Sequence, residues 1–210
     1  MIFQNRIDAA KKLSKNLEWL KKEDTTILAI PRGGVVIGDI VSSILNVRLD
    51  IIISKKIAAP HNPEFAIGAV MPDGSYVSNV EITNMLNVPQ NYIDAEISIK
   101  MREIERRLME FRGHKKYELK NKIVVLLDDG VATGATMFAA ASWVRNHYPK
   151  KLIIAIPVGP KETIDKLNKI ADEVVVLHIP LVFNSVSEFY HDFKQIDDEE
   201  VKQILITHHQ

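Results

Sequence analysis

Apolar positions recur along this chain in two periods, one typical of helices and one typical of strands. The first segment carries an apolar residue at every third or fourth position, which predicts an amphipathic helix with one buried stripe. The stripe consists of Ile7, Ala10, Leu13, Leu17 and Leu20. A short apolar run then fills residues 25–30 and ends at Pro31, which predicts a strand buried on both faces.

The remainder of the chain alternates between the same two patterns. Further strands are predicted at residues 49–53, 121–127, 152–157 and 173–177. Helices are predicted at residues 33–45, 91–112, 134–147, 161–170 and 197–206. Residues 58–63 contain two prolines and predict a loop, whereas residues 66–78 predict a small hairpin around the turn residues Pro72, Asp73 and Gly74.

Strands separated by helices of this length form βαβ units. Right-handed crossovers assemble such units into a doubly wound, mostly parallel sheet with flanking helices. No internal repeat or low-complexity linker interrupts the alternation. The sequence therefore predicts an α/β fold and a single domain over residues 1–210.

Composition narrows the class of protein. Hydrophobic residues make up 46% of the chain and charged residues 26%, as in ordinary globular domains. There is no cysteine, which excludes a disulfide framework, an Fe–S cluster, a cysteine-ligated zinc and a catalytic thiol. No apolar run approaches the ~20 residues of a membrane span, and the start of the chain does not resemble a secretory leader. We therefore expect a cytoplasmic protein without a membrane partner.

Charge gives little sign of a nucleic-acid partner. The chain has 27 basic and 27 acidic residues, so its formal net charge is zero. Only residues 100–122 are strongly basic, and we interpret them as a solvated helix face with i,i+4 pairs such as Glu103 with Arg107. Nucleic-acid binding by this stretch is the weaker alternative.

The most informative segment spans residues 124–136. An apolar run ending at Leu127 predicts a central strand, and two adjacent carboxylates, Asp128 and Asp129, follow where the strand leaves the sheet. Neighbouring side chains on a strand point to opposite faces, so both acids can emerge only where the strand ends at a cleft. Ligands of open parallel sheets bind at such carboxyl ends of strands.

A loop of small residues follows the acids and leads into a helix. Its residues present successive backbone N–H groups at a helix N-terminus without bulky side chains, which is typical of a phosphate site. They are Ala132, Thr133, Gly134, Ala135 and Thr136. A ribose 5-phosphate would satisfy both features, with its hydroxyls on the carboxylates and its phosphate on the amides. The alternative is an Asp-Gly turn followed by a threonine N-cap.

Two further strand ends carry candidate anion-binding residues. After the first strand, Arg32 is followed by Gly33 and Gly34, which permit close backbone approach. After the second, Lys55 and Lys56 follow Ser54, and one of these lysines is expected to meet an anion. The alternatives are a simple strand-to-helix turn with a surface arginine and ordinary surface lysines.

The segment at residues 124–136 resembles the 5-phosphoribosyl-1-pyrophosphate (PRPP) signature of the type I phosphoribosyltransferases. That signature is a hydrophobic strand, two acids, two variable residues and then small-Thr-Gly-small-Thr. It differs from a Walker A loop, which has a lysine after its last glycine. A Gly-x-Gly-x-x-Gly motif after a strand is also missing, which argues against a Rossmann dinucleotide enzyme.

The resemblance implies a Mg²⁺-dependent enzyme that transfers the 5-phosphoribosyl group of PRPP to a nitrogenous base or another acceptor and releases pyrophosphate. Residues 132–136 would hold the 5-phosphate. The pyrophosphate would be held by Arg32, Gly33 and Gly34 together with Lys55 or Lys56. Asp128 and Asp129 would fix the ribose and bind the metal through water, and with Arg32 they are the expected catalytic residues. The alternative is a non-catalytic PRPP-sensing regulator of the same fold. The family commonly forms homodimers.

The resemblance also bears on the acceptor. Hypoxanthine-guanine enzymes carry aspartate at the position of Ala132 and lysine at that of Ala135, which argues against 6-oxopurines as acceptors and leaves adenine, orotate or a non-base acceptor open. We expect a core at about residues 25–178, with hood or lid elements from about 57–90 and 180–210. The aromatic segment 181–193 would either stack on a flat acceptor or close the core.

A narrower likeness is to prokaryotic phosphoribosyltransferase-like proteins whose acceptor is not assigned. It rests on five short motifs: Pro31-Arg32-Gly33-Gly34, Lys56-Ile57 with Asn62-Pro63-Glu64, Gly68-Ala69-Val70, Asp128-Asp129-Gly130 and Tyr190-His191-Asp192-Phe193.

Overall fold

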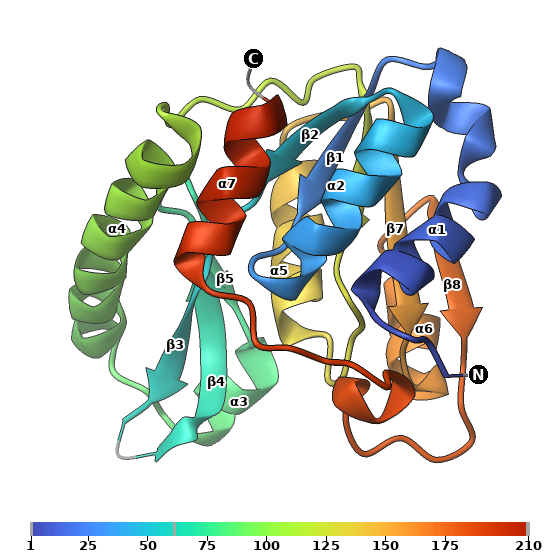
Figure 1. Ribbon diagram of the computed structural model, residues 1–210. Coiled ribbons are helices and arrows are strands. Elements are labelled where there is room, and N and C mark those ends of the chain that lie inside the picture. The colour runs from blue at the N-terminus through green and yellow to red at the C-terminus, as the bar shows by residue number, and fades with distance from the viewer. Residues whose placement is uncertain (1, 61, 209–210) are drawn as a thin grey trace.

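The computed structural model describes residues 2–60 and 62–208 and contains two β-sheets flanked by helices (Figure 1). The larger sheet has five parallel strands in the order β2-β1-β6-β7-β8. Its strands are β1 (Thr25–Ala29), β2 (Arg48–Ile51), β6 (Ile123–Leu127), β7 (Lys151–Val158) and β8 (Glu173–His178). The predicted doubly wound α/β fold is confirmed, and the winding reverses between β1 and β6.

Helices cover both faces of this sheet. The α-helices are α1 (Arg6–Asn16), α2 (Gly33–Leu45), α3 (Val80–Met85), α4 (Gln90–Arg112), α5 (Ala135–Arg145), α6 (Lys161–Leu167) and α7 (Asp198–His208), and the 3₁₀ helices are η1 (Glu18–Lys22) and η2 (Val186–Phe189). Alternate strand residues face two separate cores, as the period of a strand requires. Ile27 and Val125 pack with α1 and α2, whereas Leu28 and Val124 pack with α5 and α6.

The smaller sheet is antiparallel and has the order β3-β4-β5. Its strands are β3 (Lys55–Ala59), β4 (Asn62–Val70) and β5 (Tyr76–Ser78). The predicted hairpin is confirmed: Met71 N donates to Ser75 O at 2.9 Å, and Gly74 adopts a φ of 85° in the turn.

The loop predicted at residues 58–63 is wrong in part, because Ala58 and Ala59 end β3 and β4 begins at Asn62. Proline is tolerated in strands where the pairing is irregular. The register of this pair shifts on both sides of Ala58, which accommodates the proline-rich sequence. His61 lies outside the described residues.

One buried ion pair ties the end of α4 to the main sheet. Arg112 donates from Nε to Asp50 Oδ1 at 2.6 Å and from Nη2 to Asp50 Oδ2 at 2.7 Å. Its guanidinium also lies 3.7 Å from the ring centroid of Tyr117. Burial raises the pKa of Tyr117, which keeps that phenol neutral beside the pair. This end of α4 is therefore fixed against β2.

The carboxyl ends of β1 and β6 flank the point where the winding reverses, which is where ligands of such sheets bind. α7 lies between α2 and α4 and contacts both helices (Figure 1). Among the described helices, none combines the length and apolarity that crossing a bilayer requires.

Candidate active site

The loop that joins β6 to α5 forms an open cup. Gly134 adopts a φ of 77° directly before α5, and a Cβ there would lie 2.7 Å from Thr163 Cγ2. Thr163 in turn donates from its hydroxyl to Ala132 O at 2.7 Å, which fixes the loop against α6. Thr133 and Thr136 are exposed, and the first amides of α5 have no acceptor within the helix, so both kinds of donor are available to a ligand.

The loop after β1 packs against the end of β6. A Cβ on Gly33 would lie 1.8 Å from Asp129 Oδ2, and one on Gly34 would lie 2.9 Å from Leu127 O. The peptide bond between Pro31 and Arg32 is cis. Two glycines therefore allow this loop to approach the acids closely, as the sequence predicts.

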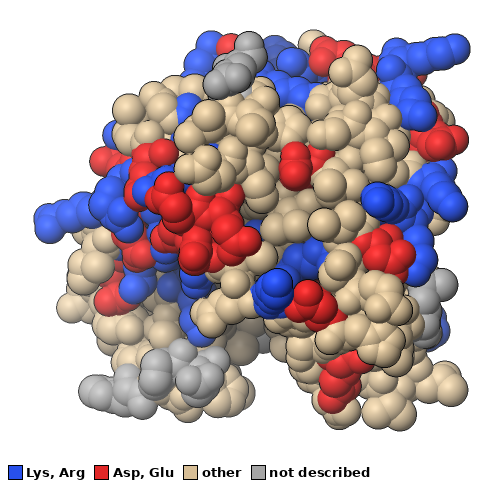
Figure 2. Space-filling view, viewed as in Figure 1, with Lys and Arg blue, Asp and Glu red and all other residues tan. Residues whose placement is uncertain are grey.

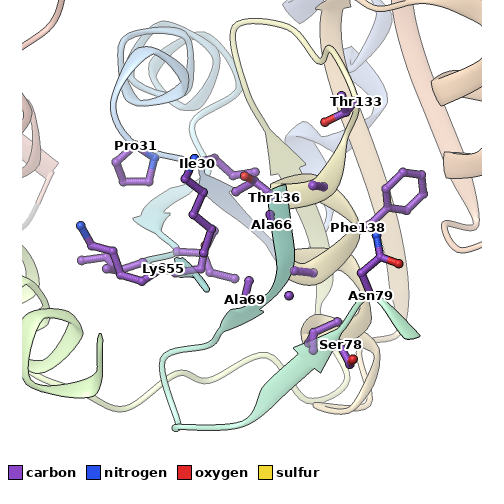
Figure 3. Close-up of a pocket in the computed structure, with 18 of the residues that line it drawn as sticks. Ile30, Pro31, Lys55, Ala66, Ala69, Ser78, Asn79, Thr133, Thr136 and Phe138 are labelled. Carbon is purple, nitrogen blue, oxygen red and sulfur yellow. The ribbon is translucent and has the colours of Figure 1, made fainter. Parts of the chain in front are cut away.

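One large cavity brings the predicted anion-binding groups together. Its volume is about 960 Å³, and Arg32, Lys55 and Lys56 line it together with Thr133 and Thr136. Figure 3 shows Pro31 and Lys55 on one side of this cavity, Thr133 on the other and Thr136 between them. The predicted phosphate cup and the predicted pyrophosphate residues thus share a single site, although they come from distant parts of the chain.

The cavity is lined by the segments that follow β1 and β2, by the N-terminal part of α5 and by the smaller sheet. Ala135 of the cup also lines it, whereas Gly33, Gly34, Ala132 and Gly134 do not. Further lining residues come from β4, β5 and the start of α3, namely Phe65, Ser78, Asn79 and Ile82, and Phe138 of α5 lies beside Asn79 (Figure 3). The first four of these residues fall within the segment expected to supply a lid, residues 57–90.

The two acids lie beside the large cavity and do not line it. Asp129 borders an adjoining cavity of about 290 Å³ together with Arg6, Gly33 and Arg32, and Arg32 lines both cavities. Asp128 lines neither. Its Oδ1 accepts a hydrogen bond from Asp129 N at 2.8 Å. The expectation that both acids open onto the same cleft as the cup therefore differs from the observed geometry.

Burial dominates the electrostatics of the acid pair. Desolvation raises the pKa of Asp128 well above its usual value, and the neighbouring charge of Asp129 raises it further. Desolvation also raises the pKa of Asp129, although Arg6 acts in the opposite direction. Two adjacent carboxylates in a desolvated position therefore favour a cation beside them.

A magnesium ion fits this donor set. Mg²⁺ prefers oxygen ligands and is usually held by one or two carboxylates, substrate oxygens and several waters. Asp128 and Asp129 supply two such carboxylates at the end of β6. No cluster of three or more metal-ligating side chains occurs within the described part of the chain, so these acids would act with substrate and water as further ligands.

Sequence reasoning missed Arg6, which organises Asp129. Arg6 donates from Nε to Asp129 Oδ2 at 2.8 Å and from Nη1 to Lys194 O at 2.7 Å. Its guanidinium lies 3.9 Å from the ring centroid of Phe193. Arg6 is only 7% exposed, whereas Ile7, predicted in the buried stripe of this helix, is 43% exposed. Arg6 precedes Ala10 by four residues, so the same helical spacing admits it to the buried face.

The aromatic segment near the C-terminus closes the core. Phe189 and Tyr190 are buried, and Phe183 stacks on Phe189 with ring centroids 5.6 Å apart. Tyr190 donates from its hydroxyl to Asp129 O at 2.6 Å, and burial raises its pKa. None of these aromatic residues lines the large cavity, and Phe193 borders the small one. The structure therefore favours the core interpretation over stacking on an acceptor.

Comparison with known proteins finds the same family that the sequence motifs resemble. The model of the phosphoribosyl transferase domain family matches residues 1–194. Two curated proteins of Mycobacterium tuberculosis, each named "Putative phosphoribosyl transferase", are 35% identical over 209 residues, which are 99% of this chain and 47% of the relative. The chain thus spans about half the length of the curated relatives it matches.

Solved structures agree with this result. The crystal structure of TT1426 from Thermus thermophilus is 38% identical with a TM-score of 0.85, and the match covers 99% of each chain. A hypoxanthine-guanine phosphoribosyltransferase (hpt-2) from Bacillus anthracis is 17% identical with a TM-score of 0.50, covering 92% of this chain and 91% of the other. At that identity the likeness concerns the fold alone.

Proposed function

Because this chain belongs to the phosphoribosyltransferase family, we propose that it is a Mg²⁺-dependent phosphoribosyltransferase that uses PRPP as donor. An acceptor atom, typically a nitrogen of a base, bonds to C1 of the ribose as the bond from C1 to the pyrophosphate oxygen breaks. Pyrophosphate leaves with the bonding electron pair, and the acceptor loses a proton.

The observation that carries this proposal is the shared cavity. A polyanion with a phosphate at one end and a pyrophosphate at the other needs two separate anion sites joined by a space for the sugar. Thr133 and Thr136 provide one site, and Arg32 with Lys55 or Lys56 provides the other. The volume of about 960 Å³ lies within the range of small-molecule sites.

In this proposal, residues 132–136 bind the 5-phosphate. The first amides of α5 donate to its oxygens, the helix dipole favours its charge, and the two threonine hydroxyls add further donors. Arg32 and one of the two lysines offset the charge that develops on the leaving pyrophosphate. The protein therefore contributes mainly by positioning PRPP and by electrostatic stabilisation.

Asp128 and Asp129 would accept hydrogen bonds from the ribose hydroxyls or from metal-bound water. A carboxylate has about four acceptor positions, so the single bond that Asp129 receives from Arg6 leaves it free to accept others. Bound Mg²⁺ would supply charge neutralisation at the pyrophosphate. The role of this chain's acids would be to hold the sugar end of PRPP beside Arg32, which borders both cavities.

A non-catalytic PRPP sensor is the second candidate function. The observation that favours it is the ion pair between Arg6 and Asp129, together with the position of both acids outside the large cavity. In a sensor, PRPP binding would be read out through the contacts of α1 and the C-terminal segment with Asp129. This function needs PRPP binding and no turnover.

A paired experiment tests both functions. Thermal melting is measured with PRPP, with and without Mg²⁺, and pyrophosphate release is then screened over nucleobases, amines and water. Stabilisation that requires Mg²⁺, together with release in the presence of one acceptor, supports the transferase. Stabilisation without release against any acceptor supports the sensor. If neither PRPP nor ribose 5-phosphate binds at millimolar concentration, both proposals are wrong.

A further inference from the structure

Three cationic side chains from separate elements meet at the end of the large cavity nearest α4 and α7. Arg32 follows β1, Lys55 begins β3 and Arg107 lies on α4, and all three line the cavity. Two carboxylates lie among them. They are Glu103 on the same helix as Arg107 and Asp198 in the first turn of α7. We call these five residues the charged cluster.

Contacts within the charged cluster cross between elements. Arg107 Nη2 lies 3.2 Å from Asp198 Oδ2, and Arg32 Nε lies 3.8 Å from Asp198 Oδ1. Lys55 Nζ bonds to Glu103 Oε1, while Arg107 Nε lies 3.7 Å from the same oxygen. Hydrogen bonding from Lys55 lowers the pKa of Glu103, so that acid is ionised. Lys56 also lines the cavity, so four lining cations outnumber the two acids of the charged cluster, neither of which lines it.

The sequence alone suggested a simpler place for Arg107, on a solvated helix face paired with Glu103. Its side chain is instead only 20% exposed and lines the cavity. The pair with Glu103 exists, but at 3.7 Å it is longer than a hydrogen bond. Arg107 is therefore directed at the candidate site, although its helix neighbours Arg106 and Glu105 are solvated.

Hydrogen bonding in the charged cluster is incomplete. Arg107 Nε and Asp198 Oδ1 are buried atoms, and neither has a hydrogen-bond partner among the described residues. A buried donor without a partner costs free energy, which a ligand oxygen would recover. Asp198 accepts a hydrogen bond from Arg107 Nη2 at 3.2 Å, whereas Arg32 Nε lies 3.8 Å from its other oxygen, beyond hydrogen-bond distance. A pyrophosphate presents more oxygens and more charge, and arginine binds such groups with several donors at once.

We propose that Arg107 is a further binding residue for the leaving pyrophosphate, and that Asp198 holds Arg32 and Arg107 until that anion displaces it. The identity of the anion rests on the proposed function. Displacement requires an acid that is not needed elsewhere. Glu199 lies 3.5 Å from Lys202, and Glu200 accepts from Asp197 N at 3.4 Å, whereas Asp198 contacts the cavity cations.

The surface around Asp198 agrees with a counterion role. Figure 2 shows acidic side chains gathered over the N-terminal end of α7, with basic side chains beside them. Acids in the first turn of a helix are stabilised by the helix dipole. This stabilisation of the Asp198 carboxylate remains when its contacts with Arg32 and Arg107 are lost.

The first test is calorimetric titration of inorganic pyrophosphate into the full chain at fixed Mg²⁺ and ionic strength. Arg107→Gln is expected to weaken pyrophosphate binding by about 10- to 100-fold, the equivalent of one charge-assisted hydrogen bond. The matched control is Arg106→Gln, since Arg106 is the next residue of the same helix, pairs with Glu110 at 2.6 Å and does not line the cavity. Equal affinities in the two variants would overturn the proposal.

The second test has the opposite sign. Asp198→Asn removes the competing charge and is expected to tighten pyrophosphate binding by about 2- to 5-fold, the range of a partly exposed ion pair. Glu199→Gln removes the same charge from the same helix turn without touching the cavity and serves as the control. Unchanged or weaker binding in Asp198→Asn would refute displacement. This variant still tests the displacement of Asp198 if Arg107→Gln does not fold.

The outcome also separates this inference from the proposed function. If PRPP and pyrophosphate bind the wild type and Arg107→Gln equally well, the inference fails and the proposed function stands. If pyrophosphate binding depends on Arg107 but PRPP does not bind, the inference stands and the proposed function fails. A wild type that does not bind pyrophosphate refutes the inference.

Discussion

Asp128→Asn is expected to stabilise the protein at neutral pH. The side chain keeps its shape and its acceptor for Asp129 N, which now bonds Asp128 Oδ1 at 2.8 Å. What disappears is a desolvated negative charge next to a second one. Binding sites for charged ligands commonly contain such groups, and neutralising them raises stability at the expense of function.

The sign follows from linkage. The pKa of Asp128 is raised in the folded state, so the native protein binds more protons than the unfolded chain as pH increases above the ordinary value of 3.8. The free energy of unfolding therefore decreases as the pH rises from 3.8 through the raised pKa of Asp128 in the folded protein. Above that raised pKa, the full destabilisation by the charged carboxylate is present. Asp128→Asn removes this cost at neutral pH and has little effect in strong acid.

The magnitude is that of a buried charged group whose lost hydration is incompletely replaced, which costs about 1–3 kcal/mol or more. A gain of at least ~1 kcal/mol would raise the melting temperature of a chain of this size by roughly 2–4 °C. The assay is thermal melting of both proteins between acidic and neutral pH, with Asp165→Asn as a control at an exposed ion pair with Lys161.

A variant that melts at or below the wild-type temperature at neutral pH would refute this reasoning. A gain that persisted unchanged in acid would also refute it, because the benefit would then have another origin. Calorimetry with PRPP completes the comparison, since the stabilised variant is expected to bind PRPP more weakly.

Three further predictions concern the cup and the core. Thr136→Val is expected to cost roughly 1–3 kcal/mol of PRPP binding through a lost donor, measured by calorimetry against Thr207→Val, and equal affinities would count against the phosphate cup. Gly134→Ala is expected to lower the free energy of unfolding by about 1–3 kcal/mol in denaturant titrations, because its φ is 77° and the added Cβ would lie 2.7 Å from Thr163. An unchanged free energy of unfolding would contradict this loop conformation. Arg112→Ala is expected to cost about 3–5 kcal/mol by the same method, since it leaves the buried Asp50 unpaired, and a loss below ~1 kcal/mol would be incompatible with that ion pair.

Much of the fold could be predicted because burial imposes a clear period on the sequence. All five residues of β6 are buried, and the apolar run that predicts this strand reflects that burial directly. The cup was also predictable, because small residues and a positive φ at Gly134 are local requirements of the turn. Prolines concealed the start of β4, since they are tolerated there by irregular pairing that sequence patterns do not reveal.

Contacts between distant segments could not be predicted in this way. Arg6 meets Asp129 across 123 positions of sequence, and Arg107 meets Asp198 across 91. Helical spacing is compatible with Arg6 on the buried face of α1, but no local sequence pattern indicates which residue it contacts. Asp129 pairs with Arg6 beside the large cavity, a long-range contact that the local pattern behind the predicted shared cleft does not contain.

The most direct test of the central claim is a crystal structure of this chain with PRPP and Mg²⁺. The account predicts the 5-phosphate at residues 132–136 and the pyrophosphate beside Arg32 and Lys55, within the cavity of about 960 Å³. An empty cavity, or PRPP bound with its 5-phosphate away from Thr133 and Thr136, would contradict it.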